Sequence, residues 1–286
     1  MCERLKGKVL LVDGFSILFR SFYAMPPNMT APDGTHTNAV YGFLSILNKE
    51  VEEESPDHLA VAFDLPSPTF RHKLYPEYKG TRKPAPSEFT EQIPVLRSLL
   101  DQMGIPVVSA EGWEADDVLG SLAGQAEASG YEVRILSGDR DLLQTVTDST
   151  VVVIPKTKGG QTVYEHYSPE DVQETYGVTP QAFIELKALM GDASDNVPGL
   201  PGVGEKTAQK ILAQFGTIEN AYAHVDELKP PKAAAAMRDG YDTLLLSKEL
   251  VTIRRDAPVT FDEEAFRMGN IYTPEAFDSF KRLGFK

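Results

Sequence analysis

Apolar positions in the first half of the chain alternate between two spacings. Residues 8–14 and 58–64 are short apolar runs that each run into an aspartate, a pattern typical of buried β-strands. Between them, residues 37–54 carry apolar side chains at the spacing of one helix face: Val40, Phe43, Leu44 and Leu47. Strands separated by helices predict a parallel sheet whose connections cross over through helices.

This alternation continues to about residue 167. We expect helices at 14–22, at 87–103 and from 114 onward, and strands at 106–109, 131–136 and 150–154. A hairpin partner near 161–165 follows the turn residues Gly159 and Gly160. From Ser168 onward the pattern changes to short helices without a convincing strand, and we interpret the remainder to Lys286 as helical. We therefore predict an α/β part at 1–167 and a helical part at 168–286.

The stretch 65–87 differs from its surroundings. It holds five prolines, two tyrosines and a single acid, Glu77, together with the basic residues Arg71, Lys73, Lys79, Arg82 and Lys83. It is longer than an ordinary connection between a strand and a helix, so it is either functional or disordered. Basic residues interleaved with aromatics suit a nucleic-acid backbone and stacked bases. The alternative is a solvated surface loop.

The overall composition is acidic, with 28 basic and 42 acidic residues and a formal net charge of −14. Taken alone, this balance argues against nucleic acid as a partner, but the objection weakens if many acids share one metal-filled pocket. The single cysteine, Cys2, excludes an intramolecular disulfide and suits a reducing compartment. No apolar run approaches the ~18 residues of a membrane span. We interpret the chain as soluble and cytoplasmic.

Acidic residues occur where the predicted strands end and where one helix begins. In an open parallel sheet these positions meet at one edge, beyond the carboxyl ends of the strands. The set comprises Asp13, Asp64, Glu114, Asp116, Asp117, Asp139, Asp141, Asp192 and Asp195. Each residue alone is better explained as a cap or turn residue than as a ligand, and it is their joint occurrence that favours a metal site. An all-carboxylate set suits Mg²⁺ or Mn²⁺, and two such ions ~3.5–4 Å apart can activate a water and stabilise a leaving oxygen.

The glycine-rich stretch 199–207 does not match a nucleotide-binding P-loop. That motif requires a lysine directly after its last glycine, whereas Glu205 stands there and Lys206 comes one residue later. A helix-hairpin-helix, in which a Gly202-Val-Gly204 turn grips a phosphate, fits better, and a plain turn is the alternative. An EF-hand, a Gly-x-Ser-x-Gly hydrolase and a zinc site each lack required residues.

Several motifs resemble the 5′-nuclease domain of bacterial DNA polymerases of family I, within the flap-endonuclease superfamily. They are Leu-Val-Asp13-Gly, Ala-Phe-Asp64 with Thr-Phe-Arg71, Tyr78-Lys-Gly-Thr-Arg82, Glu114-Ala-Asp-Asp117, Gly-Asp139-Arg-Asp141, and Gly-Asp192-Ala-Ser-Asp195 continuing into Gly-Val-Gly-Glu-Lys-Thr-Ala. The resemblance spans nearly the whole chain. It implies a PIN-like, mostly parallel sheet flanked by helices, an arch at 65–87 over the active site, and a helix-hairpin-helix near 191–215 that grips duplex DNA.

The resemblance also implies roles for individual residues. Asp192 and Asp195 would serve the more distant metal site and the other seven acids the tighter one, with Asp116 and Asp139 essential for catalysis. Lys79 and Arg82 would contact the scissile phosphate, Tyr78 would stack on a base, and Arg20 and Arg71 would contact phosphates near the 5′ end. The duplex grip would use Gly202, Gly204, Lys206 and Thr207, with a K⁺ ion there.

We therefore expect a structure-specific 5′ nuclease that cleaves 5′ flaps and 5′ ends of DNA by two-metal-ion hydrolysis, removing flaps and RNA primers in replication and repair. The family usually continues into a polymerase, whereas this sequence stops near the end of the nuclease domain. We expect a monomer. One alternative is a non-catalytic binder of DNA junctions on the same scaffold, and another is a PIN-like nuclease directed at RNA.

Overall fold

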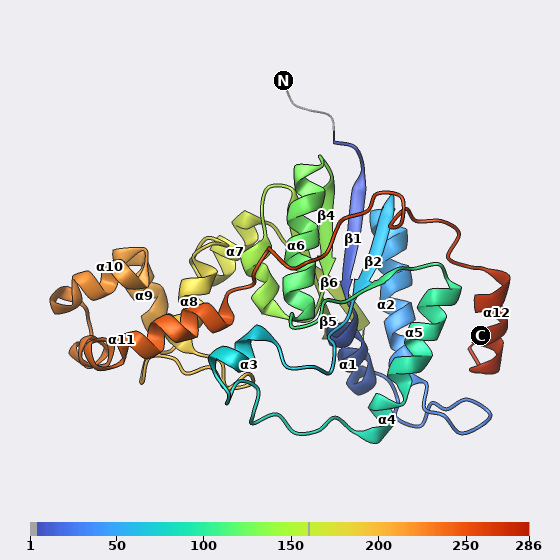
Figure 1. Cartoon of the computed structure of the whole chain (residues 1–286), viewed down its shortest axis with the longest axis horizontal. Coiled ribbons are helices and arrows are strands. Elements are labelled where there is room, and N and C mark those ends of the chain that lie inside the picture. The colour runs from blue at the N-terminus through green and yellow to red at the C-terminus, as the bar shows by residue number, and fades with distance from the viewer. Residues whose placement is uncertain (1–4, 160, 286) are drawn as a thin grey trace.

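The computed structural model describes residues 5–159 and 161–285, and Cys2, Gly160 and Lys286 lie outside them. A six-stranded sheet stands at its centre, in the order β3-β2-β1-β4-β5-β6 (Figure 1). All neighbouring strands are parallel except β5 and β6, so the mostly parallel sheet is confirmed. The strands are β1 Lys8–Asp13, β2 His58–Ala62, β3 Val107–Val108, β4 Glu132–Leu136, β5 Thr150–Lys158 and β6 Gln161–Tyr167.

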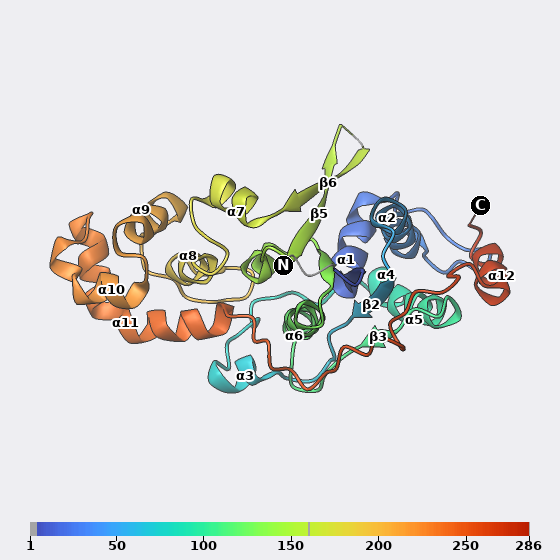
Figure 2. The ribbon, with the colours of Figure 1, turned by 90° about the horizontal axis from the view of Figure 1, so that it is seen from above.

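Helices cover both faces of the sheet and then continue into a separate group. In the α/β part they are α1 Gly14–Ala24, α2 Asn38–Glu54, α3 Phe70–Leu74, α4 Ser87–Thr90, α5 Gln92–Gln102, α6 Ala115–Ala128 and the 3₁₀ helix η1 Arg140–Thr145. The later helices are α7 Pro169–Tyr176, α8 Phe183–Met190, α9 Glu205–Phe215, α10 Ile218–Ala223, the 3₁₀ helix η2 Val225–Glu227, α11 Pro231–Val251 and α12 Pro274–Arg282. Seen from above, α8 to α11 extend to one side of the sheet (Figure 2).

Alternation along the strands divides the core into two layers. Val9 and Leu11 of β1 face the layer that contains α6, whereas Leu10 and Val12 face the layer that contains α1, α2 and α5. This follows from the two-residue period of a strand, which sends neighbouring side chains to opposite faces. Because both faces are covered, the strands are apolar throughout, as the continuous apolar runs of the sequence indicated.

The segment 252–273 corrects the expectation that everything after Ser168 is helical. We call it the return segment, because it runs back from the end of α11 across the α/β part (Figure 1). Its backbone N–H groups bond to side chains of α6, from Ala257 to Ser121 Oγ (3.0 Å) and from Phe261 to Gln125 Oε1 (2.8 Å). Side-chain partners on another element thus replace the helical hydrogen bonds that the sequence pattern suggested.

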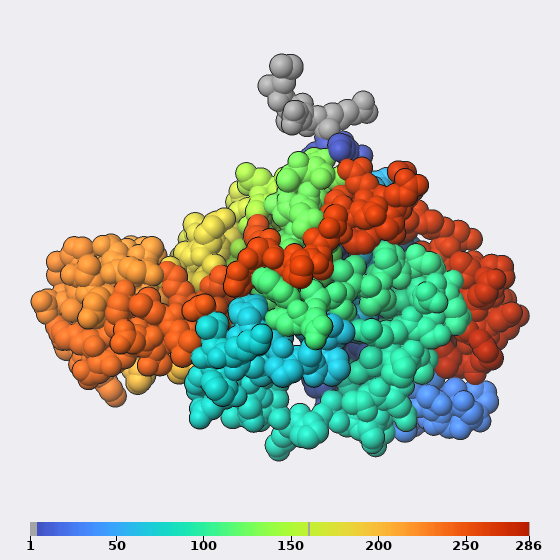
Figure 3. All heavy atoms as spheres, in the orientation of Figure 1, coloured from blue at the N-terminus to red at the C-terminus, as the bar shows by residue number. Residues whose placement is uncertain are grey.

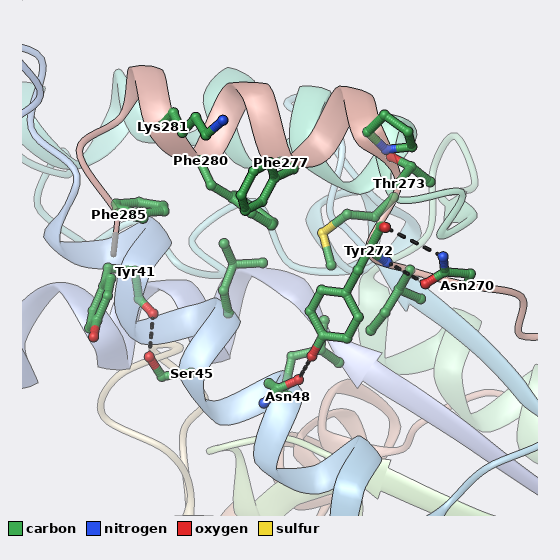
Figure 4. A pocket seen from close by; sticks show the side chains of 15 residues that line it. Tyr41, Ser45, Asn48, Asn270, Tyr272, Thr273, Phe277, Phe280, Lys281 and Phe285 are labelled. Carbon is green, nitrogen blue, oxygen red and sulfur yellow. Dashed lines mark hydrogen bonds between the residues drawn. The ribbon is translucent and has the colours of Figure 1, made fainter.

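The C-terminal helix α12 also lies on the α/β part, although the sequence analysis assigned 168–286 to one helical part. Thr273 caps α12 and its Oγ1 donates to the carbonyl of Gln102 in α5 at 2.7 Å. Figure 4 shows an apolar pocket between α2 and α12, of about 820 Å³, with Phe277 and Phe280 on one wall and Tyr41 on the other. No helix among the described residues has the length and apolar character needed to cross a membrane.

Two glycines cross in close contact where α8 ends. Gly191 adopts a φ of 71°, and a Cβ built on Gly199 would lie 2.3 Å from the carbonyl carbon of Met190. This close approach of two backbone segments closes the turn that carries Asp192 and Asp195, whose ends are joined by hydrogen bonds between Asp192 and Val197. Only glycine leaves the required space at such a crossing.

We therefore expect Gly199→Ala to destabilise the protein by about 2 kcal/mol or more, because a rigid backbone meets the added methyl group. Thermal and urea unfolding measure the effect. Gly124→Ala in α6 is the control, since nothing lies within 4 Å of the new Cβ, and alanine favours a helix by up to about 1 kcal/mol. Equal stability of the two variants would contradict the close approach of the backbone at Gly191 and Gly199.

Glu50 of α2 is a buried carboxylate without a hydrogen-bond partner among the described residues. Burial raises its pKa from the ordinary 4.5 to about 7, and the charges of Glu54 and Glu53 add to the effect. Between these two values the folded protein keeps the proton while the unfolded chain releases it. The group therefore lowers the free energy of unfolding as pH rises from about 4.5 through 7.

We expect Glu50→Gln to reduce this loss, so that between pH 5 and 8 the variant loses about 1–3 kcal/mol less stability than the wild type. Urea unfolding in EDTA at the two pH values measures the difference. Glu52→Gln is the matched control, because Glu52 lies exposed on the same helix. A pH profile that Glu50→Gln leaves unchanged would show that the buried carboxyl is not the titrating group.

Candidate active site

The ends of β1 and β2 deliver an aspartate each to one edge of the sheet. Asp13 ends β1 and caps α1, because its side chain accepts a hydrogen bond from the backbone N–H of Ser16 at 3.0 Å. Asp64 follows β2, and its Oδ1 accepts from the backbone N–H of Ala115 at 2.8 Å. Asp64 thereby fixes the first turn of α6 beside the end of β2.

Two further segments bring carboxylates to the same edge. Glu114 is the N-cap of α6, so Asp116 and Asp117 stand in the first turn of that helix, as the sequence pattern predicted. Asp139 follows β4 and caps η1, since its side chain accepts from the backbone N–H of Asp141 at 2.8 Å. Capping and strand ends therefore hold these acids in place through local backbone geometry, without the help of a bound ion.

The pKa directions show that these carboxylates act on one another. Burial, with a contribution from the charges of Asp64 and Asp139, raises the pKa of Asp13 to about 7. Burial likewise raises the pKa of Asp116 well above 3.8, with Asp139 the strongest of its charged neighbours. For Asp141, burial and then Asp139 raise the pKa to about 7, against the nearby lysine. Carboxylates from separate segments are therefore close enough to raise one another's pKa values.

Lysines occupy the spaces between the acids. Lys79 Nζ lies 2.7 Å from Glu114 Oε1, and Lys187 Nζ lies 2.8 Å from Asp141 Oδ1 and 2.7 Å from Asp192 Oδ2. Across residues 5–159 and 161–285, no three Asp, Glu, His or Cys side chains meet in an arrangement that would hold a metal ion directly. The two ammonium groups supply the positive charge that the crowded acids require.

The turn that follows α8 is bonded to the 65–87 segment. The carbonyl of Asp195 accepts from the backbone N–H of Lys79 at 2.8 Å, and Arg82 forms an ion pair with the Asp195 carboxylate. Burial alone would raise the pKa of Asp192, but hydrogen bonds from Lys187 and Ser194 hold it at about 2. The acids of this turn and the basic residues of the 65–87 segment therefore form one wall of the site.

A cavity of about 750 Å³ opens beneath the 65–87 segment. The space-filling view shows the hollow between this segment and the body of the molecule (Figure 3). Its floor carries Asp13, Asp64, Glu114, Asp116 and Asp139. Its other walls carry Lys79, Arg82 and Lys83 from the 65–87 segment and Phe15, Phe19, Arg20 and Tyr23 from α1. The cavity is therefore lined by acids on its floor and by basic residues on its other walls.

Asp117 and Arg71 are among the predicted site residues that do not line this cavity. Asp117 is fully buried, and both of its oxygens accept hydrogen bonds from Arg71, at 2.6 and 2.9 Å. Arg71 is only 2% exposed. Because each group already satisfies the other in the interior, the structure does not offer Asp117 as a metal ligand or Arg71 as a phosphate contact. Their expected roles stay predictions, and nothing in the sequence indicated that these two distant residues pair with each other.

Tyr78 is also turned away from solvent in this structure. It is 4% exposed, and its hydroxyl lies 3.1 Å from both Glu114 Oε2 and Asp195 Oδ2. The ring therefore presents no free face for the base stacking that the sequence analysis expected of it. Tyr78 instead fills the space between the start of α6 and the turn that follows α8.

The remaining predicted contacts lie in two different places. Arg20 lines the cavity beneath the 65–87 segment, where its guanidinium donates to Thr157 Oγ1 at 3.0 Å. The glycine-rich turn lies in the helical group: Gly202 has a φ of 77°, and Gly204 is the N-cap of α9, so Lys206 and Thr207 stand in its first turn. The structure therefore does not bring the hairpin residues into the acid cavity.

Sequence reasoning overlooked two residues of the site, Lys187 and Ser137. Lys187 is a lone lysine in the apolar helix α8, five residues before Asp192, and that isolation was the available signal. Ser137 Oγ donates to Asp13 Oδ2 at 2.6 Å and bonds the backbone N–H of Asp139 at 3.0 Å. Its position directly after β4 gave only a weak signal, because serine is common at strand ends.

Comparison with known proteins gives two family matches and close curated relatives. Residues 8–177 match the model described as 5′-3′ exonuclease, N-terminal resolvase-like domain, and residues 178–273 match 5′-3′ exonuclease, C-terminal SAM fold. DNA polymerase I of Bacillus caldotenax is 48% identical over 282 residues, which is 99% of this chain and 32% of that protein. DNA polymerase I of Bacillus subtilis is 46% identical over 285 residues, with shares of 100% and 32%.

The chain thus spans about a third of the length of these curated relatives. Among solved structures, a flap endonuclease of bacteriophage T5, in a complex with DNA and metal ions, aligns with a TM-score of 0.71 at 22% identity, over 97% of this chain and 99% of that one. At this identity the likeness is one of fold. With the two consecutive family matches covering most of its length, this chain belongs to the 5′-3′ exonuclease family.

Proposed function

We propose that this chain is a metal-dependent, structure-selective 5′ nuclease that hydrolyses phosphodiester bonds at 5′ flaps and 5′ ends of DNA. The observation that carries the proposal is the cavity beneath the 65–87 segment, with carboxylates on its floor and Lys79 and Arg82 above them. Membership of the 5′-3′ exonuclease family supports the reaction class. The bacteriophage T5 relative, whose structure contains DNA and metal ions, supports DNA as substrate and metal as cofactor.

The carboxylates of the cavity floor, together with those of the adjoining pocket that Glu114, Asp116 and Asp139 also line, fit divalent ions that prefer oxygen ligands, Mg²⁺ or Mn²⁺. Asp13, Asp64, Glu114, Asp116, Asp139 and Asp141 would hold ions on one side, and Asp192 and Asp195 would hold an ion on the other. When bound, such ions activate water and stabilise the leaving oxygen of a phosphodiester. The lysines between the acids are consistent with this assignment, because they stand where positive charge is required.

The residues of the 65–87 segment would place the scissile phosphate. Lys79 and Arg82 line the cavity, and both are paired with carboxylates, Lys79 with Glu114 and Arg82 with Asp195. Once cations neutralise those carboxylates, the two basic side chains become available for the phosphate. They would then stabilise the charge that develops on it during hydrolysis.

The helical group would bind the duplex next to the cut. The first backbone N–H groups of α9 follow an exposed glycine turn, and Lys206 is exposed beside them, an arrangement suited to a phosphate. We also propose that a K⁺ ion binds at this turn. Contacts of this kind recognise the shape of DNA and not its sequence. Since the curated relatives are about three times as long, we further propose that the nuclease acts beside a linked polymerase part, removing flaps and RNA primers in replication and repair.

Asp116→Asn tests the catalytic assignment. We expect the variant to bind a 5′-flap duplex within a few-fold of the wild type, because the helical group is untouched, and to cleave it in Mg²⁺ at least about 1,000-fold more slowly. Single-turnover cleavage of labelled flap DNA and fluorescence anisotropy measure the two quantities. Asp101→Asn on the exposed side of α5 is the control.

Full activity of Asp116→Asn would contradict the role of this residue. Binding of flap DNA by the wild type without cleavage in either Mg²⁺ or Mn²⁺ would favour the non-catalytic junction binder. Cleavage of a matching RNA in preference to the DNA would favour the RNA-directed nuclease. EDTA is expected to abolish cleavage by the wild type.

The raised pKa values predict that metal binding depends on pH. Asp13 and Asp141, with pKa values of about 7, hold protons in the metal-free protein at and below neutral pH, and an ion must displace them. Affinity for Mg²⁺ should therefore rise between pH 6 and 8, by about ten-fold for each displaced proton. Calorimetry in buffers of different ionisation enthalpy measures the protons released, and a pH-independent affinity would contradict the assignment.

A further inference from the structure

Arg71 lies where three elements meet. It belongs to α3, at the start of the 65–87 segment, and its guanidinium donates to both oxygens of Asp117 in α6. Its Nε donates to the carbonyl of Leu250 at 2.8 Å, and one of its terminal nitrogens donates to the carbonyl of Thr252 at 2.8 Å. Leu250 and Thr252 form the C-terminal end of α11. One side chain thus holds the 65–87 segment, α6 and α11 together.

Asp117, the partner of Arg71, also has hydrogen-bond donors on both of its oxygens. Besides Arg71, Asp117 accepts from the backbone N–H of Arg254 at 2.9 Å and from that of Glu114 at 3.2 Å. Burial alone would lower the pKa of Arg71, but the hydrogen bonds and charge of Asp117 raise it, so the guanidinium stays charged. A buried ion pair with every lone pair occupied fixes geometry more than it adds stability.

Each of the three elements leads to a different part of the proposed machinery. The 65–87 segment continues to Lys79, and α6 begins at Glu114, whose Oε2 lies 3.3 Å from the Arg71 guanidinium. Helix α11 belongs to the helical group: Ser247 Oγ donates to the carbonyl of Pro198, directly before the glycine-rich turn. Arg71 therefore touches a cavity carboxylate on one side and, through α11, the glycine-rich turn on the other.

We propose that Arg71 is a positioning residue that couples the grip of the helical group on duplex DNA to the placement of Glu114 and Lys79 in the cavity. The proposal rests on the proposed function and goes beyond it by assigning a route between two sites. A duplex held at the glycine-rich turn fixes α11 through the Ser247–Pro198 hydrogen bond, the C-terminal carbonyls of α11 fix the guanidinium, and the guanidinium fixes the start of α6.

The chemistry of the position requires a guanidinium. A guanidinium has five N–H donors in one plane, so it can donate to both oxygens of Asp117 and to the carbonyls of Leu250 and Thr252 at the same time. An ammonium has only three donors and no fixed plane. A purely structural role would predict only a loss of stability in variants. Coupling predicts in addition that the cleavage step stops responding to the length of bound duplex.

The test compares cleavage of two 5′-flap DNAs in saturating single-turnover experiments with Mg²⁺. One has a duplex long enough to reach the glycine-rich turn, and the other has a duplex too short to do so. We expect the wild type to cleave the long substrate about ten-fold faster at saturation, a typical coupling between sites. In Arg71→Lys we expect the ratio of the two rates to fall to about one, while binding of the long duplex stays within a few-fold.

Two further variants keep the outcome interpretable. Arg134→Lys is the control, because Arg134 is a partly buried arginine paired with an acid, Glu54, away from the cavity, and it should keep the wild-type ratio. If Arg71→Lys does not fold, the double variant Arg71→Met with Asp117→Leu leaves no buried charge unpaired and should show the same lost ratio.

Thermal unfolding accompanies each measurement. An unchanged ratio in a folded Arg71 variant, or a wild-type ratio of one, would overturn the coupling. Failure of the wild type to cleave either substrate would instead overturn the proposed function. The two failures are therefore distinguishable.

Discussion

Mutual repulsion between buried carboxylates is the constraint on which this structure depends. The fold brings acids from the ends of β1, β2 and β4 and from the start of α6 to one edge, where burial and neighbouring charges raise the pKa values of Asp13 and Asp116. Such a group is tolerable only with protons or cations among its members. In this structure Lys79 and Lys187 supply the positive charge, and the same need makes the edge a suitable place for divalent ions.

Local signals in the sequence were sufficient for most of the fold. The apolar runs that end in Asp13 and Asp64 became β1 and β2, and the spacing after Glu114 became α6 with its acids in the first turn. These predictions succeeded because strand burial and helix capping are decided within a few residues. The parallel order of the strands then placed the acids at one edge, as connection rules require.

Features that depend on distant partners could not be predicted in the same way. Arg71 and Asp117 each looked like a surface group at the site, and only their pairing in three dimensions shows that they are buried together. The return segment has no periodicity, because its hydrogen bonds go to Ser121 and Gln125 of α6 and not to itself. Lys187 likewise acquires its role only because α8 packs beside η1, where Asp141 lies.

The return segment changes how the helical group is attached. Because 252–273 runs back to the sheet and α12 packs on α5, the chain leaves the α/β part after β6 and re-enters it after α11. The helical group is therefore an insertion that the chain joins to the α/β part at both of its ends. A body joined to its neighbour at two points keeps mainly a rotation about the line between those points, so chain connectivity limits the directions in which the helical group can move.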